Sequence, residues 1–196
     1  MKKLIWFTTL IILFLIFVAP AILALGIKLI PGGDQPGYSN TLAIYGIRSV
    51  TQKITSTKTN FSAIGTSIKN PNLKNKKDIV LTLYDENLNL QRTSVINGQN
   101  IQDGDFVKFV FDVIPDSENK VYIFNLSSPS AGPEDKIDVF LSQNPPNWIT
   151  EYHYDKDTLK GGLPIVLYFK PVSKITVIKN IYSNFVCKAV NKLCLF

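Results

Sequence analysis

The stretch that decides the fold is DFVKFVFDV, residues Asp105–Val113. Successive side chains of an extended strand point to opposite faces. The alternation separates two sets of residues: Phe106, Lys108, Val110 and Asp112 on one face, and Val107, Phe109, Phe111 and Val113 on the other. Because the second set is entirely apolar and the first is mixed, the stretch predicts a strand with one buried and one exposed face.

Similar segments lie on both sides of this strand. They share short apolar alternation and β-branched or aromatic residues: Leu42–Ile47, Val50–Ile54, Phe61–Ile68, Asp78–Tyr84, Leu88–Val95, Val121–Leu126, Lys136–Leu141 and Leu163–Phe169. Short connectors rich in Asn, Asp, Ser, Gly or Pro separate these segments, and none of the segments has helical periodicity. The pattern predicts an all-β fold, an antiparallel jelly-roll-like β-sandwich over residues 41–172.

The N-terminal segment has a different composition. Residues Leu4–Ile27 contain no charged side chain, and Lys3 and Lys28 flank them. A helix of this length spans ~36 Å, enough to cross a hydrocarbon core of ~30 Å. Trp6 lies near the charged end, where an indole suits the membrane interface. Residues 1–30 are therefore predicted to be a single transmembrane anchor in the cytoplasmic membrane.

A cleaved signal peptide is the alternative for the same segment. Lys2 and Lys3 form a basic start, and Ala19-Pro20-Ala21 resembles an A-x-A cleavage site. The proline within that site and the apolar run beyond it favour an uncleaved anchor. Under either interpretation the two lysines keep the N-terminus inside, so we expect the following domain on the extracytoplasmic side.

The segments that flank the predicted sandwich are short. Residues 31–40 (PGGDQPGYSN) are rich in Gly, Pro and polar groups and predict a linker. In the tail, residues 173–196, Ile175–Ile178 is β-branched and predicts a final strand. From Lys179 onward we expect a basic amphipathic helix.

The predicted tail helix has an apolar face. We expect this face to contact the membrane or a partner through Ile178, Ile181, Tyr182 and Phe185. Closing one end of the sandwich is an equal alternative. Cys187 and Cys194 would lie ~10 Å apart in a continuous helix, beyond disulfide reach, whereas a loop would allow a bridge.

The charge distribution argues against nucleic-acid binding. The chain carries a net charge of +6, but residues 1–33 contribute +3 and residues 171–196 contribute +4. The predicted domain between them is close to neutral. Phosphate binding needs cations gathered on the binding domain, so nucleic acid is not an expected partner.

Two longer runs carry a resemblance to a known group. In VTQKITSTKTNFSAIGTSI the positions are Gln52, Asn60, Phe61, Ile64 and Gly65; in FVKFVFDVIPDSENKVYIFNLSSPSAGPEDKIDVFLS they are Pro115, Asp116, Ser117, Lys120 and Tyr122. Over roughly residues 48–141 the chain resembles the jelly-roll, galactose-binding-like β-sandwich modules of bacterial membrane and cell-envelope proteins. Lys53-Ile54 departs from the usual Thr-Phe. The resemblance implies a β-sandwich fold, on which carbohydrate binding is common.

The candidate ligand-binding residues are aromatic. On a regular strand Trp148, Tyr152 and Tyr154 would share one face, and an exposed row of this kind stacks on sugar rings. The same row facing inward would be core. The only histidine, His153, lies among them without a nucleophile elbow or metal-ligand spacing.

These observations predict a non-enzymatic protein without catalytic residues, bound metal or cofactor. Asp103-Gly104-Asp105 is interpreted as a turn rather than a calcium site. We expect a structural or accessory subunit of a cell-envelope or surface assembly. The membrane lipid around the N-terminal helix and protein partners, or a second copy, would be its contacts. The alternative is a carbohydrate-binding module, with a glycan as the ligand.

Overall fold

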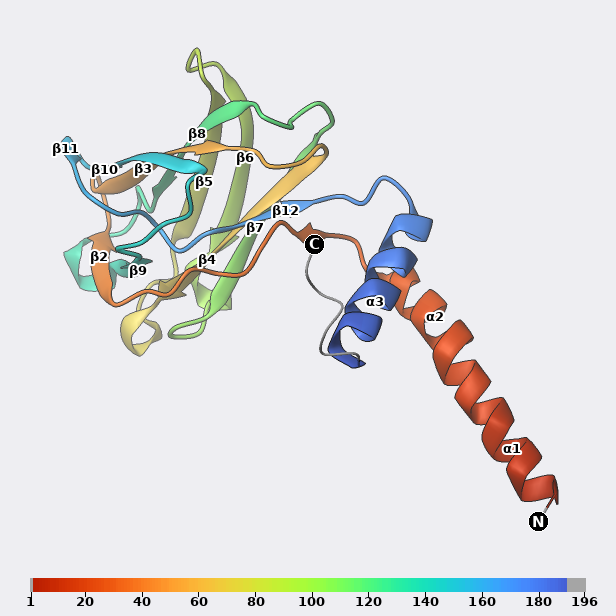
Figure 1. The fold of residues 1–196 in the computed structure, drawn as a ribbon. Coiled ribbons are helices and arrows are strands. Elements are labelled where there is room, and N and C mark those ends of the chain that lie inside the picture. The colour runs from red at the N-terminus through yellow and green to blue at the C-terminus, as the bar shows by residue number, and fades with distance from the viewer. Residues whose placement is uncertain (1, 190–196) are drawn as a thin grey trace. The chain divides into compact units, whose positions relative to one another are not determined.

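The computed structural model describes residues 2–189, and side chains up to residue 183. The chain is an antiparallel β-sandwich preceded by an apolar helix and followed by a short helix, as predicted (Figure 1). It forms two compact units. Pro31–Phe169 is the β unit, and the residues up to Ile30 together with those from Lys170 onward form the helical unit.

The β unit contains two six-stranded sheets. The first sheet consists of β1 (Ile30–Pro31), β2 (Asn40–Ile44), β4 (Phe61–Lys69), β7 (Phe106–Ile114), β9 (Ile137–Leu141) and β12 (Val166–Phe169). Its order is β1-β12-β4-β9-β2, and β7 also pairs with β4. From β2 onward the paired strands are antiparallel.

The second sheet has the order β11-β10-β3-β8-β5-β6. Its strands are β3 (Ser49–Thr55), β5 (Asp78–Asp85), β6 (Leu90–Asn97), β8 (Val121–Ser127), β10 (Ile149–Tyr154) and β11 (Asp157–Thr158), all paired antiparallel. Short 3₁₀ turns occur at Pro71–Leu73, Gly98–Asn100 and Pro133–Asp135. Only β5–β6 and β10–β11 are consecutive strands paired in one sheet, so the chain mostly crosses from sheet to sheet.

The core lies between the two sheets, and the alternation predicted for residues 105–113 is confirmed. In β7, Val107, Phe109 and Phe111 are buried, whereas Phe106, Lys108, Val110 and Asp112 are exposed. Phe111 makes an edge-to-face contact with Phe61 of β4, with ring centroids 5.1 Å apart. This strand therefore separates core from surface residue by residue.

Strand β4 is buried on both faces from Phe61 to Ile68. Its outer face is covered because Gly65 lets two aromatic rings approach the backbone. A Cβ at position 65 would lie 2.5 Å from the Phe106 ring and 2.9 Å from the Tyr168 ring. The Lys108 ammonium lies 4.7 Å from the centroid of the Tyr168 ring. A glycine is thus required here by close packing rather than by backbone conformation.

Two buried asparagines fix the loops at one end of the sandwich. The Asn70 side-chain amide donates to the carbonyls of Asn75 and Gly98, both at 3.1 Å. The Asn75 amide donates to Asp135 O at 2.6 Å, and Asn75 Oδ1 accepts from Lys77 N at 2.8 Å. Both side chains are fully buried, so these bonds satisfy groups that no solvent reaches.

Residues 31–40, predicted to be a linker, belong to the β unit. Gly32 N donates to Leu167 O at 2.8 Å. The Gln35 amide donates to Ser67 Oγ at 3.0 Å and to Pro164 O at 3.1 Å. Glycine and proline prevent long regular strands in this segment, but they do not keep its polar groups from bonding to the sheet.

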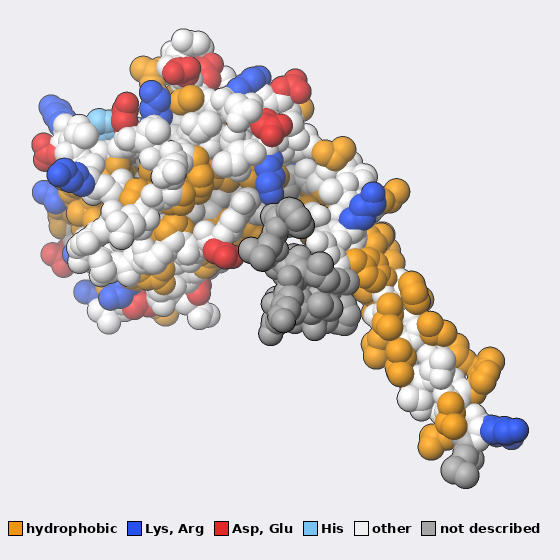
Figure 2. All heavy atoms as spheres, in the orientation of Figure 1, with side chains coloured by type: hydrophobic (Ala, Val, Ile, Leu, Met, Phe, Trp, Pro, Cys, Tyr) orange, Lys and Arg blue, Asp and Glu red, His pale blue; other side chains and the backbone are white. Residues whose placement is uncertain are grey.

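The helical unit begins with one long apolar helix. It comprises α1 (Lys2–Leu13), a π-helical turn (Phe14–Val18) and α2 (Ala19–Gly26). This 25-residue helix is long and apolar enough to cross a membrane. Apolar side chains cover its visible face in Figure 2. The structure thus supplies a candidate membrane span at the predicted position.

The C-terminal helix corrects one prediction. Helix α3 spans Lys174–Ala189, so Ile175–Ile178 is the first turn of this helix and not a strand. Ser173 is the reason: its hydroxyl accepts from Thr176 N at 3.2 Å, which starts the helix despite the β-branched residues. The side chains of Phe185 and Cys187, and all of Cys194, lie outside the described part of the chain.

Candidate functional site

The three predicted ligand-binding aromatics do not share a face. A bulge interrupts the pairing of β10 with β3 between Ile149 and Glu151. Ile149 and Tyr152 are therefore both buried, and Thr150 and Glu151 between them are both exposed. The regular alternation expected for this segment is wrong, because a bulge adds a residue to one strand and shifts every later side chain.

Tyr152 belongs to the core rather than to a ligand platform. Its side chain is 1% exposed, and its hydroxyl has no hydrogen-bond partner. Burial raises the pKa of this phenol above its usual range, so it stays neutral. On the adjacent strand its pairing partner Gln52 is also buried, with Oε1 accepting from Leu163 N at 2.7 Å. A ligand at the surface cannot reach Tyr152.

Tyr154 connects the two sheets. Its hydroxyl donates to Ala43 O of β2 at 2.7 Å and accepts from Arg48 Nη1 at 3.2 Å. The Arg48 guanidinium also lies 4.0 Å from an Asp155 carboxylate oxygen. The hydrogen bond with Tyr154, more than the nearby carboxylate, raises the pKa of Arg48. The contacts of Tyr154 are thus structural ones between strand edges.

Trp148 lines a cleft. The cleft has a volume of about 210 Å³ and is lined by Gly32, Gly33, Asp34, Thr57, Pro146, Trp148, Val166 and Leu167. An aromatic ring, a carboxylate and a hydroxyl therefore border one small space. Asp34 and Thr57 were not predicted, because PGGD was interpreted as a linker and Thr57 lies in a turn.

His153 has local partners only. Its Nδ1 lies 3.0 Å from Thr158 Oγ1 across the β10–β11 pair, and Nε2 lies 3.8 Å from Glu151. Within the described residues, no three His, Cys, Asp or Glu side chains gather in a way that could hold a metal ion. The two ring nitrogens of His153 thus face one hydroxyl and one carboxylate, both from neighbouring positions on β10 and β11.

The outer face of the second sheet is less polar than expected. Antiparallel sheets normally place polar residues on the side away from the core. Here nine outward positions on β5, β6 and β8 carry no charge, and six of them are apolar or aromatic: Val80, Thr82, Tyr84, Leu90, Thr93, Val95, Val121, Ile123 and Asn125. We call this set the outer face.

Strand pairing makes the outer face continuous. Val80 pairs with Val95, Thr82 pairs with both Thr93 and Asn125, and Tyr84 pairs with Leu90 and Ile123. The Asn125 amide donates to Thr51 Oγ1 at 2.9 Å and to Ser49 Oγ at 3.0 Å. Charged groups lie at the borders of this set: Asp78 is exposed at the start of β5, and toward β10 Lys53 lies 3.8 Å from Glu151. The result is an uncharged, partly apolar surface across three strands.

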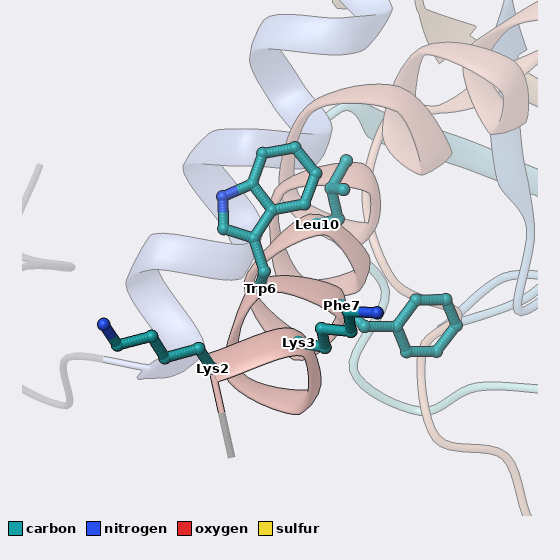
Figure 3. Close-up of a pocket in the computed structure, with 5 residues that line it drawn as sticks. All are labelled: Lys2, Lys3, Trp6, Phe7 and Leu10. Atoms are coloured by element: carbon teal, nitrogen blue, oxygen red, sulfur yellow. The ribbon is translucent and has the colours of Figure 1, made fainter.

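The N-terminal end of the long helix carries a different group of side chains. Lys2, Lys3, Trp6, Phe7 and Leu10 surround a shallow hollow, and in Figure 3 the rings of Trp6 and Phe7 project to different sides of the helix. One helix supplies all five residues, so nothing encloses a ligand there. Two ammonium groups beside an indole are typical of a helix end at the membrane interface.

Helix α3 packs against the long helix within the helical unit. A groove of about 530 Å³ is lined by Leu15, Ile16, Ala19, Pro20, Leu23, Ile181 and Tyr182. Val177 is buried and Ile178 is half-buried. Of the predicted tail contacts, Ile181 and Tyr182 thus line the groove, whereas the side chain of Phe185 lies outside the described residues.

No protein-family model matches the chain, and no curated protein is significantly similar to it. The proposals that follow therefore depend on the residues and contacts described above.

Proposed function

We propose that this protein is a membrane-anchored structural or accessory subunit of a cell-envelope or surface assembly. The N-terminal helix would hold it in the cytoplasmic membrane with Lys2 and Lys3 inside. The sandwich would then lie on the extracytoplasmic side and bind a protein partner. The observation that carries this proposal is the uncharged outer face of the second sheet.

The chemistry of the outer face suits a protein partner. The buried centres of protein interfaces are depleted in charged residues and enriched in apolar and aromatic ones. Val95 is 52% exposed and Leu90 is 61% exposed, so large apolar groups are accessible on this face. Contiguous apolar surface on a soluble domain commonly marks an interaction site. A sugar would instead require polar groups beside an exposed ring.

The test is recovery of the full-length protein from its native membrane in mild detergent, with mass analysis of what accompanies it. Val95→Glu and Ile123→Glu place a carboxylate on the outer face, and each should lower the yield of a stoichiometric companion at least tenfold. Ile47→Glu is the matched control, because Ile47 is 97% exposed in a turn outside this face. Retention of the companion by both outer-face variants would contradict the proposal, as would recovery of a lone monomer.

The Trp148 cleft favours a second candidate function, the binding of one sugar ring. Its volume of about 210 Å³ is below the ~300–1,000 Å³ of pockets for drug-sized ligands, so only a small ligand fits. Trp148 offers a stacking face, and Asp34 and Thr57 offer hydrogen bonds to hydroxyls. These three groups support a terminal monosaccharide rather than a long chain.

A glycine in the cleft allows a clean test of this second candidate. A Cβ at Gly33 meets nothing within 4 Å, so Gly33→Leu should fill the cleft without straining the fold. Gly37→Leu is the control, since its position is equally open but outside the cleft. In a glycan array, Gly33→Leu should abolish the retention shown by wild type and Gly37→Leu. Equal retention by both variants, or none by wild type, would contradict sugar binding.

A further inference from the structure

The long helix contains a carbonyl that its own backbone cannot satisfy in the usual way. In an α-helix each carbonyl accepts from the N–H four residues later. The residue four after Ile16 is Pro20, which has no N–H. The neighbouring turn is π-helical, and Ala19 N–H bonds to Phe14 O instead of to Leu15 O. The carbonyls of Leu15 and Ile16 therefore both lack their α-helical donors.

Helix α3 supplies a donor to the second of these carbonyls. The Tyr182 hydroxyl donates a hydrogen bond to Ile16 O. The two residues are 166 positions apart, and the Tyr182 side chain lines the groove together with Pro20 and Ile181. A polar group within an otherwise apolar groove is thus placed at the carbonyl whose α-helical donor would be the missing N–H of Pro20.

A second contact fixes the other end of the long helix. Lys174 Nζ donates to Ala24 O at 3.1 Å, Leu25 O at 3.1 Å and Ile27 O at 2.7 Å. The last carbonyls of a helix have no intrahelical donors and lie at the negative end of its dipole. The Lys174 ammonium group therefore caps the C-terminal end of the long helix. Tyr182 bonds to the same helix nearer its N-terminus, at Ile16.

These two contacts place α3 beside the membrane-spanning part of the long helix, and not only at the membrane surface. Ile16 and Gly26 are ten residues apart, which corresponds to ~15 Å along the helix axis. The hydrocarbon region contains no water, so a free carbonyl there needs a protein donor. We propose that α3 enters the membrane beside the N-terminal helix and replaces, through Tyr182, the hydrogen bond that Pro20 removes. The two chain ends then form one membrane unit, and the N-terminal helix is retained rather than cleaved.

The polar side of α3 is compatible with this position. Lys179, Asn180 and Ser183 are exposed and lie away from the groove. Lys179 is five residues beyond Lys174, or ~7.5 Å deeper, within the distance that a lysine side chain spans to reach the headgroups. The inference goes beyond the proposed function, since it concerns the anchor and not the sandwich.

The test is a disulfide cross-link in native membranes, in the full chain with Cys187 and Cys194 replaced by Ser. Ala19→Cys and Ile181→Cys line the same groove and lie at similar depth, since Tyr182 bonds to Ile16 O and Lys174 to the carbonyls near Gly26, so they should cross-link. Leu10→Cys with Ile181→Cys is the control pair, since Leu10 lies outside the groove and should give no product. Intact mass of the purified wild-type chain should show residues 1–21 still present.

A double-variant comparison identifies the hydrogen bond itself. Tyr182→Phe removes only the hydroxyl and should lower the cross-link yield about threefold, the size of a typical hydrogen bond between membrane helices. Pro20→Ala restores a backbone N–H, so in that background Tyr182→Phe should have no effect. An equal loss in both backgrounds, absence of the 19–181 cross-link, or a chain lacking residues 1–21 would each overturn the proposal.

Discussion

Strands β7 and β10 have similarly alternating sequences but present their side chains differently. Over its first seven residues β7 keeps its exposed and buried faces separate. In β10 a bulge beside β3 allows Ile149 and Tyr152, three residues apart, to be buried together. Trp148 and Tyr154 are then left with unrelated contacts, one in a cleft and the other on Arg48. The pairing of β7 with β4 also shifts register, between Val110 and Ile114, but only near the end of the strand, so the position of a bulge decides whether alternation predicts a face.

The two strands also differ in how they meet the opposite sheet. Arg92 of β6 donates to the β7 carbonyls of Asp112 at 2.9 Å and Val113 at 3.2 Å. At the other side of the sandwich, Tyr154 of β10 donates to Ala43 O of β2. Each side chain occupies carbonyls of an edge strand, which are otherwise available to another chain. Both sides of the sandwich are therefore protected, by a cation in one case and a phenol in the other.

The largest expected effect concerns the two faces of strand β7. Phe109→Ala removes a fully buried ring from β7 and should lower the free energy of unfolding by about 3–5 kcal/mol. Val110→Ala, one residue along and 54% exposed, should change it by less than about 0.5 kcal/mol. Urea unfolding of the full chain in detergent, followed by circular dichroism, measures both. Similar losses for the two variants would show that β7 is not a two-faced strand.

The next effect compares the two protected edges. Arg92→Ala removes two charge-assisted bonds to β7, one of them at a solvent-exposed site, and should cost about 1–2 kcal/mol. Tyr154→Phe removes the neutral bond to β2 and the solvent-exposed bond accepted from Arg48, and should cost about 1 kcal/mol. Thermal unfolding with light scattering checks both, since freed carbonyls should also increase aggregation. A larger cost for Tyr154→Phe would reverse the ranking of the two edges.

A smaller effect sharpens the interpretation of β10. The Tyr152 hydroxyl is buried without a partner, so Tyr152→Phe should leave stability unchanged or raise it by up to about 1 kcal/mol. The same urea titration measures this difference. A clear loss of stability would mean that the hydroxyl makes a hydrogen bond, for example to a buried water next to Gln52.

Regular local patterns accounted for much of the fold. The nine alternating segments overlap strands and the apolar N-terminal run coincides with the long helix, because each pattern depends on side chains close in sequence. The two-residue strands β1 and β11 are too short to leave a pattern. The helical start at Ser173 was missed because a single capping hydroxyl outweighed the β-branched ITVI.

The candidate sites depended on contacts that the sequence does not display. Asp34 joins Trp148 in one cleft although more than a hundred residues separate them. The pairing of Tyr182 with the carbonyl that precedes Pro20 by four residues also joins the two ends of the chain. The proline was visible in the sequence, but the identity of its compensating donor required the tertiary structure.

The smallest expected effect concerns the edge of the second sheet opposite β10. Asp85 holds the β5–β6 turn by accepting four hydrogen bonds, from Asn87 N, Asn89 N, Asn89 Nδ2 and Gln91 Nε2. The bonds from Asn89, chiefly its side-chain amide, lower the pKa of this carboxyl below its usual value. A carboxylate with a lowered folded-state pKa stabilises the fold fully above its ordinary pKa of about 4, and that contribution is lost as the pH falls through the lowered value.

The expected change is small because Asp85 is exposed to solvent. Acidification below about pH 4 should therefore speed hydrogen exchange at the Asn89 amide, because this amide donates to the Asp85 carboxylate. The amides of β10 do not donate to Asp85, so their exchange should change less. Asp85→Asn should remove this pH dependence while β10 behaves as before. If the β10 amides lost protection first, the β10 edge and not the β5–β6 hairpin would be the acid-sensitive side of the sheet.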